Sequence, residues 1–171
     1  MSDQARTALP ELDRGAADVF WRRFLASGGE DPGAEYTDLS TFGDSVELAD
    51  ELLALVLEGR KRATAGSLAE YEIEEFATPQ VGDRWIVCDG QGRPRVIVET
   101  TDVRIGPLSS VDDQFAWDEG EGDRTRDDWL RGHTDYFTRS HEEAGIPFHP
   151  DIPVVFERFD VLHQVSDTDL V

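Results

Sequence analysis

The chain has 171 residues, with 37 Asp or Glu against 16 Lys or Arg, so its formal net charge is −21. Such a charge argues against broad, sequence-independent binding to nucleic acid, because that binding gains its affinity from neutralised phosphates. We therefore expect no duplex DNA partner. The net charge does not exclude a small basic pocket. Among the 16 basic residues only Lys61 is a lysine, and all the others are arginine.

The length and composition indicate one globular domain. Hydrophobic residues make up 39% of the chain, which is enough to bury a core despite the charge. We predict a single domain over residues 14–165, between polar tails at 1–13 and 166–171 that we expect to be flexible. No apolar run approaches the roughly 18 residues that span a membrane, so we expect no membrane association. The lone cysteine, Cys88, cannot form an internal disulfide, which favours the reducing cytoplasm.

Two helical patterns lie in the first third of the chain. Apolar residues cluster on one helical face between Arg14 and Ser27. Residues 36–42 are predicted to be extended or irregular. A leucine-rich helix then opens at Asp44, which has capping-box spacing with Glu47.

The lone lysine follows this leucine-rich helix. Gly59 stands where a helix C-terminal cap belongs, so residues 60–66 leave the helix and carry Lys61. Residues 67–76 are predicted to form a short helix.

Strands are predicted mainly in the second half of the chain. Residues 85–88 and 95–103 are rich in β-branched and apolar side chains, and the Asp-Gly-Gln-Gly turn at 89–92 joins them as a hairpin. Residues 154–162 form a final predicted strand. We therefore expect an α+β fold with a largely antiparallel sheet or barrel, rather than regular βαβ units.

Helical segments and an acidic loop lie between these predicted strands. Residues 111–116 resemble a helical turn, and a Glu-Gly-Glu-Gly-Asp loop follows at 119–123. Residues 125–144 are predicted to form the second strong helix. The stripe along this helix consists of Trp129, His133, Tyr136, Phe137 and Ser140.

Lys61 and Thr64 are the first candidates for chemistry. A lysine beside a hydroxyl is a workable nucleophile pair, because a weakly nucleophilic hydroxyl needs a base or a fixed cation next to it. Residues three apart point to opposite faces of an extended strand, whereas a turn lets them converge. A solvated lysine at a helix end is the alternative, but elsewhere this chain has arginine at every basic position.

The acidic loop supplies the second set of candidates. Glu119, Glu121 and Asp123 can act as acid–base groups or as metal ligands. They can equally stabilise the following helix, because negative charge is favourable near a helix N-terminus. Their spacing does not match the calcium loop of an EF-hand.

His133 lies in the aromatic stripe of the second strong helix. A histidine in such a stripe is usually a packed, hydrogen-bonded core residue, and a functional role is the alternative. We expect no metal and no cofactor, because the other histidines and the cysteine have no zinc-binding spacing. These residues are His141, His149, His163 and Cys88.

Arginines flank both the lone lysine and the acidic loop. Arg60, Arg62 and Arg124 can gather into one positive patch, and with Asp123 and His133 they are the predicted substrate contacts. Ordinary surface pairing with the many carboxylates is the alternative, and such pairs contribute little. Further arginines that can join the patch are Arg93, Arg95, Arg104 and Arg126.

Taken in order, these motifs resemble the ASCH-domain family, in its longer bacterial type. The resemblance covers about residues 20–163 and rests on Phe42-Gly43-Asp44-Ser45, Gly59-Arg60-Lys61-Arg62-Ala63-Thr64, Val81-Gly82-Asp83, Val96-Ile97-Val98-Glu99-Thr100, Phe115-Ala116, the acidic loop, Trp129, His133 and Glu157-Arg158-Phe159. It implies an α+β fold with a PUA-like β-barrel of mostly antiparallel strands, surrounding helices, and a cleft beside the lysine segment.

The resemblance also implies activities. ASCH and PUA-like domains are associated with RNA, and some small members are amidohydrolases that remove the acyl group from N4-acetylcytidine with a Lys, a Thr and a Glu. Lys61 and Thr64 match the first two. The Glu is best matched by Glu119, three residues after Ala116, with Glu121 as the other candidate. This chain is longer than those members, and its Ala63-Thr64-Ala65-Gly66 replaces their β-branched, Arg-containing continuation.

Three functions therefore stand as expectations. The first is a hydrolase that acts on a modified nucleoside or a related small amide, similar to an N4-acetylcytidine amidohydrolase. An RNA-binding module or ribonuclease is the alternative, and short single-stranded RNA would then lie in a basic cleft. A non-catalytic ligand-binding regulator is the second alternative, which a Thr64 side chain pointing away from Lys61 would favour.

Overall fold

The structure, a computed structural model, describes residues 6–28 and 31–165. The chain divides into two compact units, each described by itself below. The first unit takes Met1–Glu58, Gly82–Glu99 and Asp160–Val171, and the second takes Gly59–Val81 and Thr100–Phe159. Of the tails expected to be flexible, residues 1–5 and 166–171 lie outside the described residues. The single domain over 14–165 stays a prediction.

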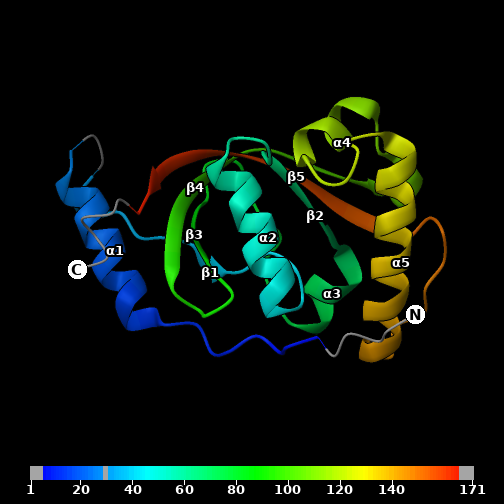
Figure 1. The fold of residues 1–171 in the computed structure, drawn as a ribbon, viewed down its shortest axis with the longest axis horizontal. Coiled ribbons are helices and arrows are strands. Elements are labelled where there is room, and N and C mark those ends of the chain that lie inside the picture. Colours follow the sequence, from blue (N-terminus) through cyan, green and yellow to red (C-terminus); the bar gives the residue numbers. More distant parts are fainter. Residues whose placement is uncertain (1–5, 29–30, 166–171) are drawn as a thin grey trace. The chain divides into compact units, whose positions relative to one another are not determined.

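Helices and strands alternate irregularly along the described chain, as Figure 1 shows. The helices are α1 Arg14–Ala26, α2 Val46–Leu57, α3 Leu68–Ile73, α4 Asp113–Glu119 and α5 Arg126–Ala144, with a 3-10 turn at Leu108–Ser110. The strands are β1 Asp38–Ser40, β2 Ala63–Ser67, β3 Arg84–Cys88, β4 Pro94–Pro107 and β5 Pro153–Gln164.

These strands form a sheet in the order β1-β3-β4-β5-β2. The β3–β4 and β2–β5 pairs are antiparallel, and the short β1 runs parallel to β3. The predicted α+β fold with a mostly antiparallel sheet is therefore confirmed. The predicted hairpin is confirmed too, since β3 and β4 flank its turn and the Asp89 carboxylate accepts hydrogen bonds from the backbone of Gln91 and Arg93.

The core of the first unit forms between α1 and strands β1, β3 and β4. Asp13 caps α1 by accepting a hydrogen bond from the Ala16 backbone N–H at 2.9 Å. Burial of the apolar face of α1 stabilises the helix, because burial, more than helix propensity, stabilises short helices in water. The buried residues of this cluster are Ala17, Phe20, Trp21, Phe24, Leu39, Ile86, Cys88 and Ile97.

The first turn of α2 differs from the prediction by one residue. Ser45, and not Asp44, is the N-cap, and its hydroxyl accepts from the Leu48 backbone N–H at 3.3 Å. The Asp44 carboxylate instead forms an ion pair with Arg6, with 2.7 Å between Arg6 Nη1 and Asp44 Oδ2. The predicted cap at Asp44 is therefore wrong by one residue, because serine is as good an N-cap as aspartate and here takes that place.

The second unit packs α4 and α5 against β2 and β5. Figure 1 shows α4 beside the first turns of α5. Thr125 caps α5 by accepting from the Asp128 backbone N–H, and Gly145 ends the helix, which confirms the predicted helix over 125–144. The buried cluster is Ala63, Leu108, Val111, Phe115, Ala116, Trp129, Phe137, Ile152, Val154 and Phe156.

The helix before the acidic loop is longer than predicted. A helical turn was expected at 111–116, whereas α4 runs to Glu119 and is capped at its start by Asp112. Gly120 then takes a left-handed conformation with φ of 75°, which ends the helix. Glu119 is therefore the last helical residue and not a loop residue, and this places its side chain in the core of the second unit.

Among the helices in the described part of the chain, none combines the length and the apolar character needed to cross a membrane.

Candidate active site

Lys61 is buried between two carboxylates of the second unit. Only 1% of its side chain is exposed. Its Nζ donates to Glu121 Oε1 at 2.6 Å and lies 3.5 Å from Glu119 Oε1. The lone lysine is therefore not a solvated lysine at a helix end. It is a buried ammonium, and the two carboxylates supply the opposite charges that such a group needs close to it.

The end of α4 is held against the lysine segment by backbone contacts. The Arg62 backbone N–H donates to the Asp118 carbonyl at 2.7 Å. Gly120 lies so close that a Cβ there would stand 2.5 Å from the Arg60 carbonyl oxygen. Glu119, which follows Asp118, is thereby fixed within reach of Lys61.

Glu119 accepts hydrogen bonds from two neighbours on α5. His133 Nε2 lies 2.9 Å from Glu119 Oε1, and the Trp129 indole N–H donates to Oε2. The imidazole of His133 stacks on the Trp129 ring at 3.7 Å between centroids, with an interplanar angle of 10°. Only 2% of the Glu119 side chain is exposed, and both of its oxygens have donors.

The two glutamates differ in their proton affinity. Burial alone would raise the pKa of Glu119, but the charges of His133 and Lys61 outweigh burial and lower this pKa from 4.5 to about 2. Burial raises the pKa of Glu121 above 4.5, although Lys61 acts in the opposite direction. Burial would lower the pKa of His133, but Glu119 outweighs it and raises this pKa above 6.5.

This arrangement can separate acid–base roles. Two carboxylates whose pKa values are driven apart by their surroundings can take different parts in proton transfer. Glu119 stays ionised and fully hydrogen-bonded, so it is a weak base. Glu121 keeps 30% of its side chain exposed and holds a proton more readily, so it suits proton exchange with a bound molecule.

Thr64 lies in β2, where it faces a different carboxylate. Its neighbours Ala63 and Ala65 pack with the core under α4 and α5. Because side chains alternate along a strand, Thr64 points to the opposite face of β2, where its cross-strand neighbour is Glu157. Glu157 is buried and accepts a hydrogen bond from the Thr100 hydroxyl at 2.5 Å. The register of β2 thus gives Thr64 an acidic neighbour, Glu157, that lies outside the predicted acidic loop.

Two of the predicted substrate-binding residues, Arg60 and Asp123, make contacts in the acidic loop, and Arg62 binds the lysine segment. Arg60 donates to the Gly122 carbonyl at 2.9 Å, and Arg62 donates to the Lys61 carbonyl at 2.8 Å. Asp123 accepts from the Thr125 backbone N–H and hydroxyl at 2.8 and 2.6 Å. This last contact supports the alternative interpretation, in which acids of the loop stabilise the start of α5.

Arg124 directly follows the acidic loop and binds Trp117. Its guanidinium lies 3.8 Å over the Trp117 ring and donates twice to the Trp117 carbonyl. The Arg124 backbone takes a left-handed conformation, with φ of 64°, which an arginine rarely adopts. Arg60 and Arg124 therefore both hold the loop that carries Glu121, through the Gly122 carbonyl and the Trp117 carbonyl.

The remaining arginines of the predicted patch bind other groups. Arg93 and Arg95 both contact Asp89 in the first unit. Arg104 stacks over Phe156 and donates to the Ser110 hydroxyl. Arg126 donates to the carbonyls of Val111 and Ser109.

Sequence reasoning missed the role of Trp129 and the acidic neighbour of Thr64. Trp129 stood in the predicted stripe as a core residue, yet its indole N–H binds Glu119. The spacing of Trp129 and His133, one helical turn apart, was the available signal, since such residues share a helix face. No local pattern could pair Thr64 with Glu157, because this pairing depends on the register of distant strands.

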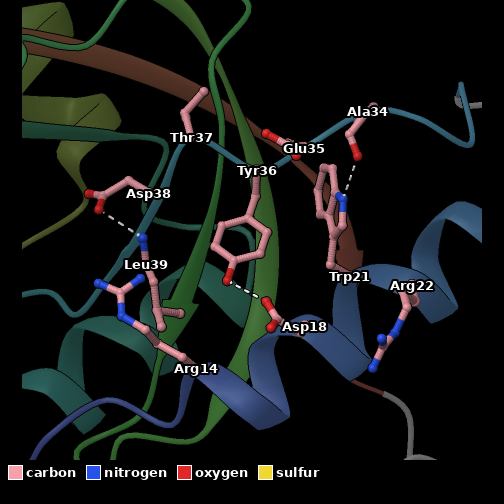
Figure 2. Close-up of a pocket in the computed structure, with 10 residues that line it drawn as sticks. All are labelled: Arg14, Asp18, Trp21, Arg22, Ala34, Glu35, Tyr36, Thr37, Asp38 and Leu39. Atoms are coloured by element: carbon pink, nitrogen blue, oxygen red, sulfur yellow. Dashed lines mark hydrogen bonds between the residues drawn. The ribbon is translucent and has the colours of Figure 1, made fainter.

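A cavity of about 550 Å³ lies in the first unit and contains none of the predicted site residues. Figure 2 shows it between α1 and the segment that leads into β1, with the Tyr36 hydroxyl donating to Asp18 and the Trp21 indole donating to the Ala34 carbonyl. Its lining carries more carboxylates than guanidinium groups, so it is not a basic groove for an RNA strand. The charged lining residues are Arg14, Asp18, Arg22, Glu35 and Asp38.

No metal-binding cluster of three or more His, Cys, Asp or Glu side chains occurs within residues 6–28 and 31–165. Within the same residues Cys88 is a buried free thiol, and burial raises its pKa to about 12. A thiol held in its protonated form is a poor nucleophile, so the described cysteine is chemically inert.

Comparison with known proteins gives consistent likenesses. The family model of the ASCH domain matches residues 38–163. The crystal structure of a protein from Enterococcus faecalis V583, assigned to the family DUF984, aligns with a TM-score of 0.84 and 34% identity over 93% of this chain and 95% of that one. The ASCH domain from Lactobacillus crispatus JV V101 aligns with a TM-score of 0.78 and 29% identity over 94% and 98%. A search of curated proteins gives no match.

Proposed function

The chain belongs to the ASCH-domain family, and we propose that it is a hydrolase that cleaves the amide of a small, nucleoside-like substrate at Lys61. The observation that supports this proposal most is the buried Lys61 ammonium, which lies between an ionised Glu119 and a more readily protonated Glu121. A cation and a proton acceptor held side by side are what attack on an amide carbonyl requires.

The proposed reaction uses water as the nucleophile. Glu121, as a carboxylate, removes a proton from water while the water oxygen forms a bond to the carbonyl carbon. The Lys61 ammonium donates a hydrogen bond to the oxyanion that develops. The C–N bond then breaks, and Glu121 returns its proton to the leaving amine, so the products are a carboxylate and an amine.

Thr64 remains the alternative nucleophile. In that version its hydroxyl attacks the carbonyl, the amine leaves, and water then hydrolyses the acyl-threonine ester. The register of β2 with β5 places Thr64 beside Glu157, and Glu157 would then be the nearest base. Thr64→Val and Thr64→Ser distinguish the two versions, because only attack by Thr64 requires a hydroxyl at this position.

A small substrate suits the site better than a long RNA chain. The ammonium of Lys61 is surrounded by carboxylates, and the chain has a net charge of −21. Phosphates of a polymer would be repelled by both, whereas a neutral nucleoside would not. Short single-stranded RNA stays the alternative ligand, and a cytoplasmic location stays a prediction.

The test is hydrolysis of N4-acetylcytidine by the purified protein, followed as cytidine release by chromatography. We expect cleavage by the wild type and losses of roughly 10²–10⁴-fold for Lys61→Met and Glu121→Gln, which is the range for removal of a positioned acid–base group. Glu143→Gln is the matched control, because Glu143 is an exposed glutamate on α5, and it should leave the rate unchanged.

Two results would contradict the proposal. One is a Lys61→Met variant that cleaves at the wild-type rate. The other is a wild type that binds acylated nucleosides without releasing the amine, which would favour a ligand-binding regulator. A salt-sensitive shift of short single-stranded RNA without cleavage of the amide would favour the RNA-binding alternative.

A further inference from the structure

His133 makes two hydrogen bonds whose partners both accept. Its Nδ1 lies 3.0 Å from the Trp129 carbonyl oxygen, and its Nε2 lies 2.9 Å from Glu119 Oε1. A carbonyl oxygen and an ionised carboxylate can only accept, so each ring nitrogen must carry a hydrogen. The contacts therefore suit an imidazolium, and a substrate cannot reach either nitrogen without displacing a protein group.

The ring of His133 is fixed in orientation as well as in charge. It stacks on Trp129, and its other neighbour along α5 is the Phe137 ring at 6.0 Å. Only 14% of the His133 side chain is exposed. Since the Trp129 indole N–H donates to the same Glu119 carboxylate, the two α5 side chains hold both oxygens of Glu119 together.

One oxygen of Glu119 lies between two cations. Oε1 is 2.9 Å from His133 Nε2 and 3.5 Å from Lys61 Nζ, whereas Lys61 is only 2.6 Å from Glu121. His133 thus makes the closer contact with Glu119 and leaves Lys61 directed at Glu121. Without the imidazolium, Glu119 would lose its closer cation, and its attraction for Lys61 would draw the ammonium toward it.

We propose that His133 is a positioning residue, which binds Glu119 and thereby keeps the Lys61 ammonium directed at Glu121. This inference rests on the proposed function for its effect on catalysis, but the arrangement of charges exists without it. The groups that face His133 are Glu119 from α4, Glu121 from the acidic loop, and the Trp129 carbonyl and ring from its own helix. Lys61 faces the same glutamates from the segment before β2.

The test compares His133→Gln and His133→Phe with His149→Gln. Glutamine keeps a hydrogen-bond donor without the charge, phenylalanine keeps the stacking without a donor, and His149 is exposed. With N4-acetylcytidine we expect kcat to fall about 10- to 100-fold for both His133 variants, with KM within about twofold, as for loss of a charged hydrogen bond behind a reacting group. The dependence of kcat on pH should also change for these variants and not for His149→Gln.

Two further readouts need no catalysis. Nitrogen-15 NMR of the wild type at pH 6 should show both nitrogens of His133 protonated. Lys61 is the only lysine, so an amine-reactive reagent and mass spectrometry report on this site alone, apart from the N-terminal amine. We expect His133→Gln to change the labelling rate of Lys61 at least about threefold. A change of less than 1 kcal/mol in the free energy of the Lys61 ion pairs would produce this effect.

A neutral His133 at pH 6, or unchanged Lys61 labelling in His133→Gln, would overturn the inference. So would His133 variants whose kcat and pH profile match those of His149→Gln. If the wild type cleaves no amide, the proposed function fails, while the NMR and labelling results still decide the role of His133. Because glutamine is close to histidine in size and polarity, His133→Gln keeps the test decisive even if His133→Phe does not fold.

Discussion

His133 and His141 lie on the same helix, α5, in the second unit, yet they have opposite kinds of partner. His133 faces the charged groups of Glu119, Glu121 and Lys61. His141 Nε2 lies 2.7 Å from the Ser67 hydroxyl, and its Nδ1 lies 3.3 Å from the Pro147 carbonyl. One histidine belongs to an ionic cluster, and the other bonds to a hydroxyl and a carbonyl, which carry no charge.

The difference shows which buried polar group can take part in chemistry. A neutral ring satisfies both contacts of His141, since one nitrogen donates to the carbonyl and the other accepts from the hydroxyl. Ser67 and His141 are 0% and 1% exposed, so a substrate cannot reach them. The cluster of His133, in contrast, ends at the partly exposed Glu121. Burial of a polar side chain therefore does not indicate an active site, whereas a cluster of charged side chains that reaches the surface does.

The largest expected effect comes from Lys61→Met, which would leave the buried Glu119 and the partly exposed Glu121 without the ammonium between them. We expect the free energy of unfolding to fall by about 3–5 kcal/mol, the usual cost of breaking a buried ion pair by removing one partner. Urea unfolding followed by tryptophan fluorescence measures this loss. Lys61→Met with Glu121→Gln should recover part of it, and a double variant no more stable than the single one would contradict a cluster balanced by charge.

Ser67→Ala should have a smaller effect, confined to stability. It leaves the buried Nε2 of His141 without a partner, which costs about 1–3 kcal/mol. The matched control is Ser140→Ala, since the Ser140 hydroxyl donates to a carbonyl of its own helix, that of Phe137, at 3.4 Å. Cleavage of N4-acetylcytidine by folded Ser67→Ala should equal that of the wild type. A loss of kcat in this variant would contradict the distinction between His133, which belongs to the candidate active site, and His141, which does not.

The smallest effect is a change of stability with pH. The lowered pKa of Glu119 contributes stability that is present above 4.5 and lost as the pH falls toward about 2. The raised pKa of His133 contributes stability that is present below 6.5 and lost as the pH rises through its raised value. The stabilisation from the ion pair of these two residues is thus complete between about pH 4.5 and 6.5.

The free energy of unfolding of the wild type minus that of His133→Gln should therefore be largest between about pH 4.5 and 6.5 and should shrink on both sides. Glu121, whose pKa is raised, favours the folded state at low pH in both proteins, so its contribution largely cancels in this difference. Urea titrations at a series of pH values measure it. A difference that does not vary with pH would mean that His133 contributes packing and no charge.

Much of the fold followed from local patterns in the sequence. The β3–β4 hairpin, the helix after Thr125 and the resemblance to the ASCH family are confirmed. The hairpin has a turn of Asp and Gly between β-branched runs, and the helix has a threonine cap and a terminal glycine. Such signals lie within a few residues of what they specify, which is why one sequence suffices to read them.

The geometry of the site could be predicted only in part. The absence of any other lysine singled out Lys61, and the structure places it beside both predicted glutamates. The sequence could not show that Glu119 ends a helix and turns into the core, since this depends on the left-handed Gly120 docking against Arg60. It also could not show that His133 lies behind Glu119, because that contact joins two helices across the core.

The central claim, that Lys61 is a buried ammonium held by Glu121 and Glu119, can be tested by NMR of protein labelled with nitrogen-15 at the lysine Nζ. With one lysine in the chain, one signal is expected. We predict that the Nζ hydrogens exchange slowly enough with water to be observed near neutral pH, because burial and ion pairing protect them, and that Glu121→Gln accelerates this exchange. A lysine whose hydrogens exchange as fast as those of an exposed side chain, with no response to Glu121→Gln, would contradict the account.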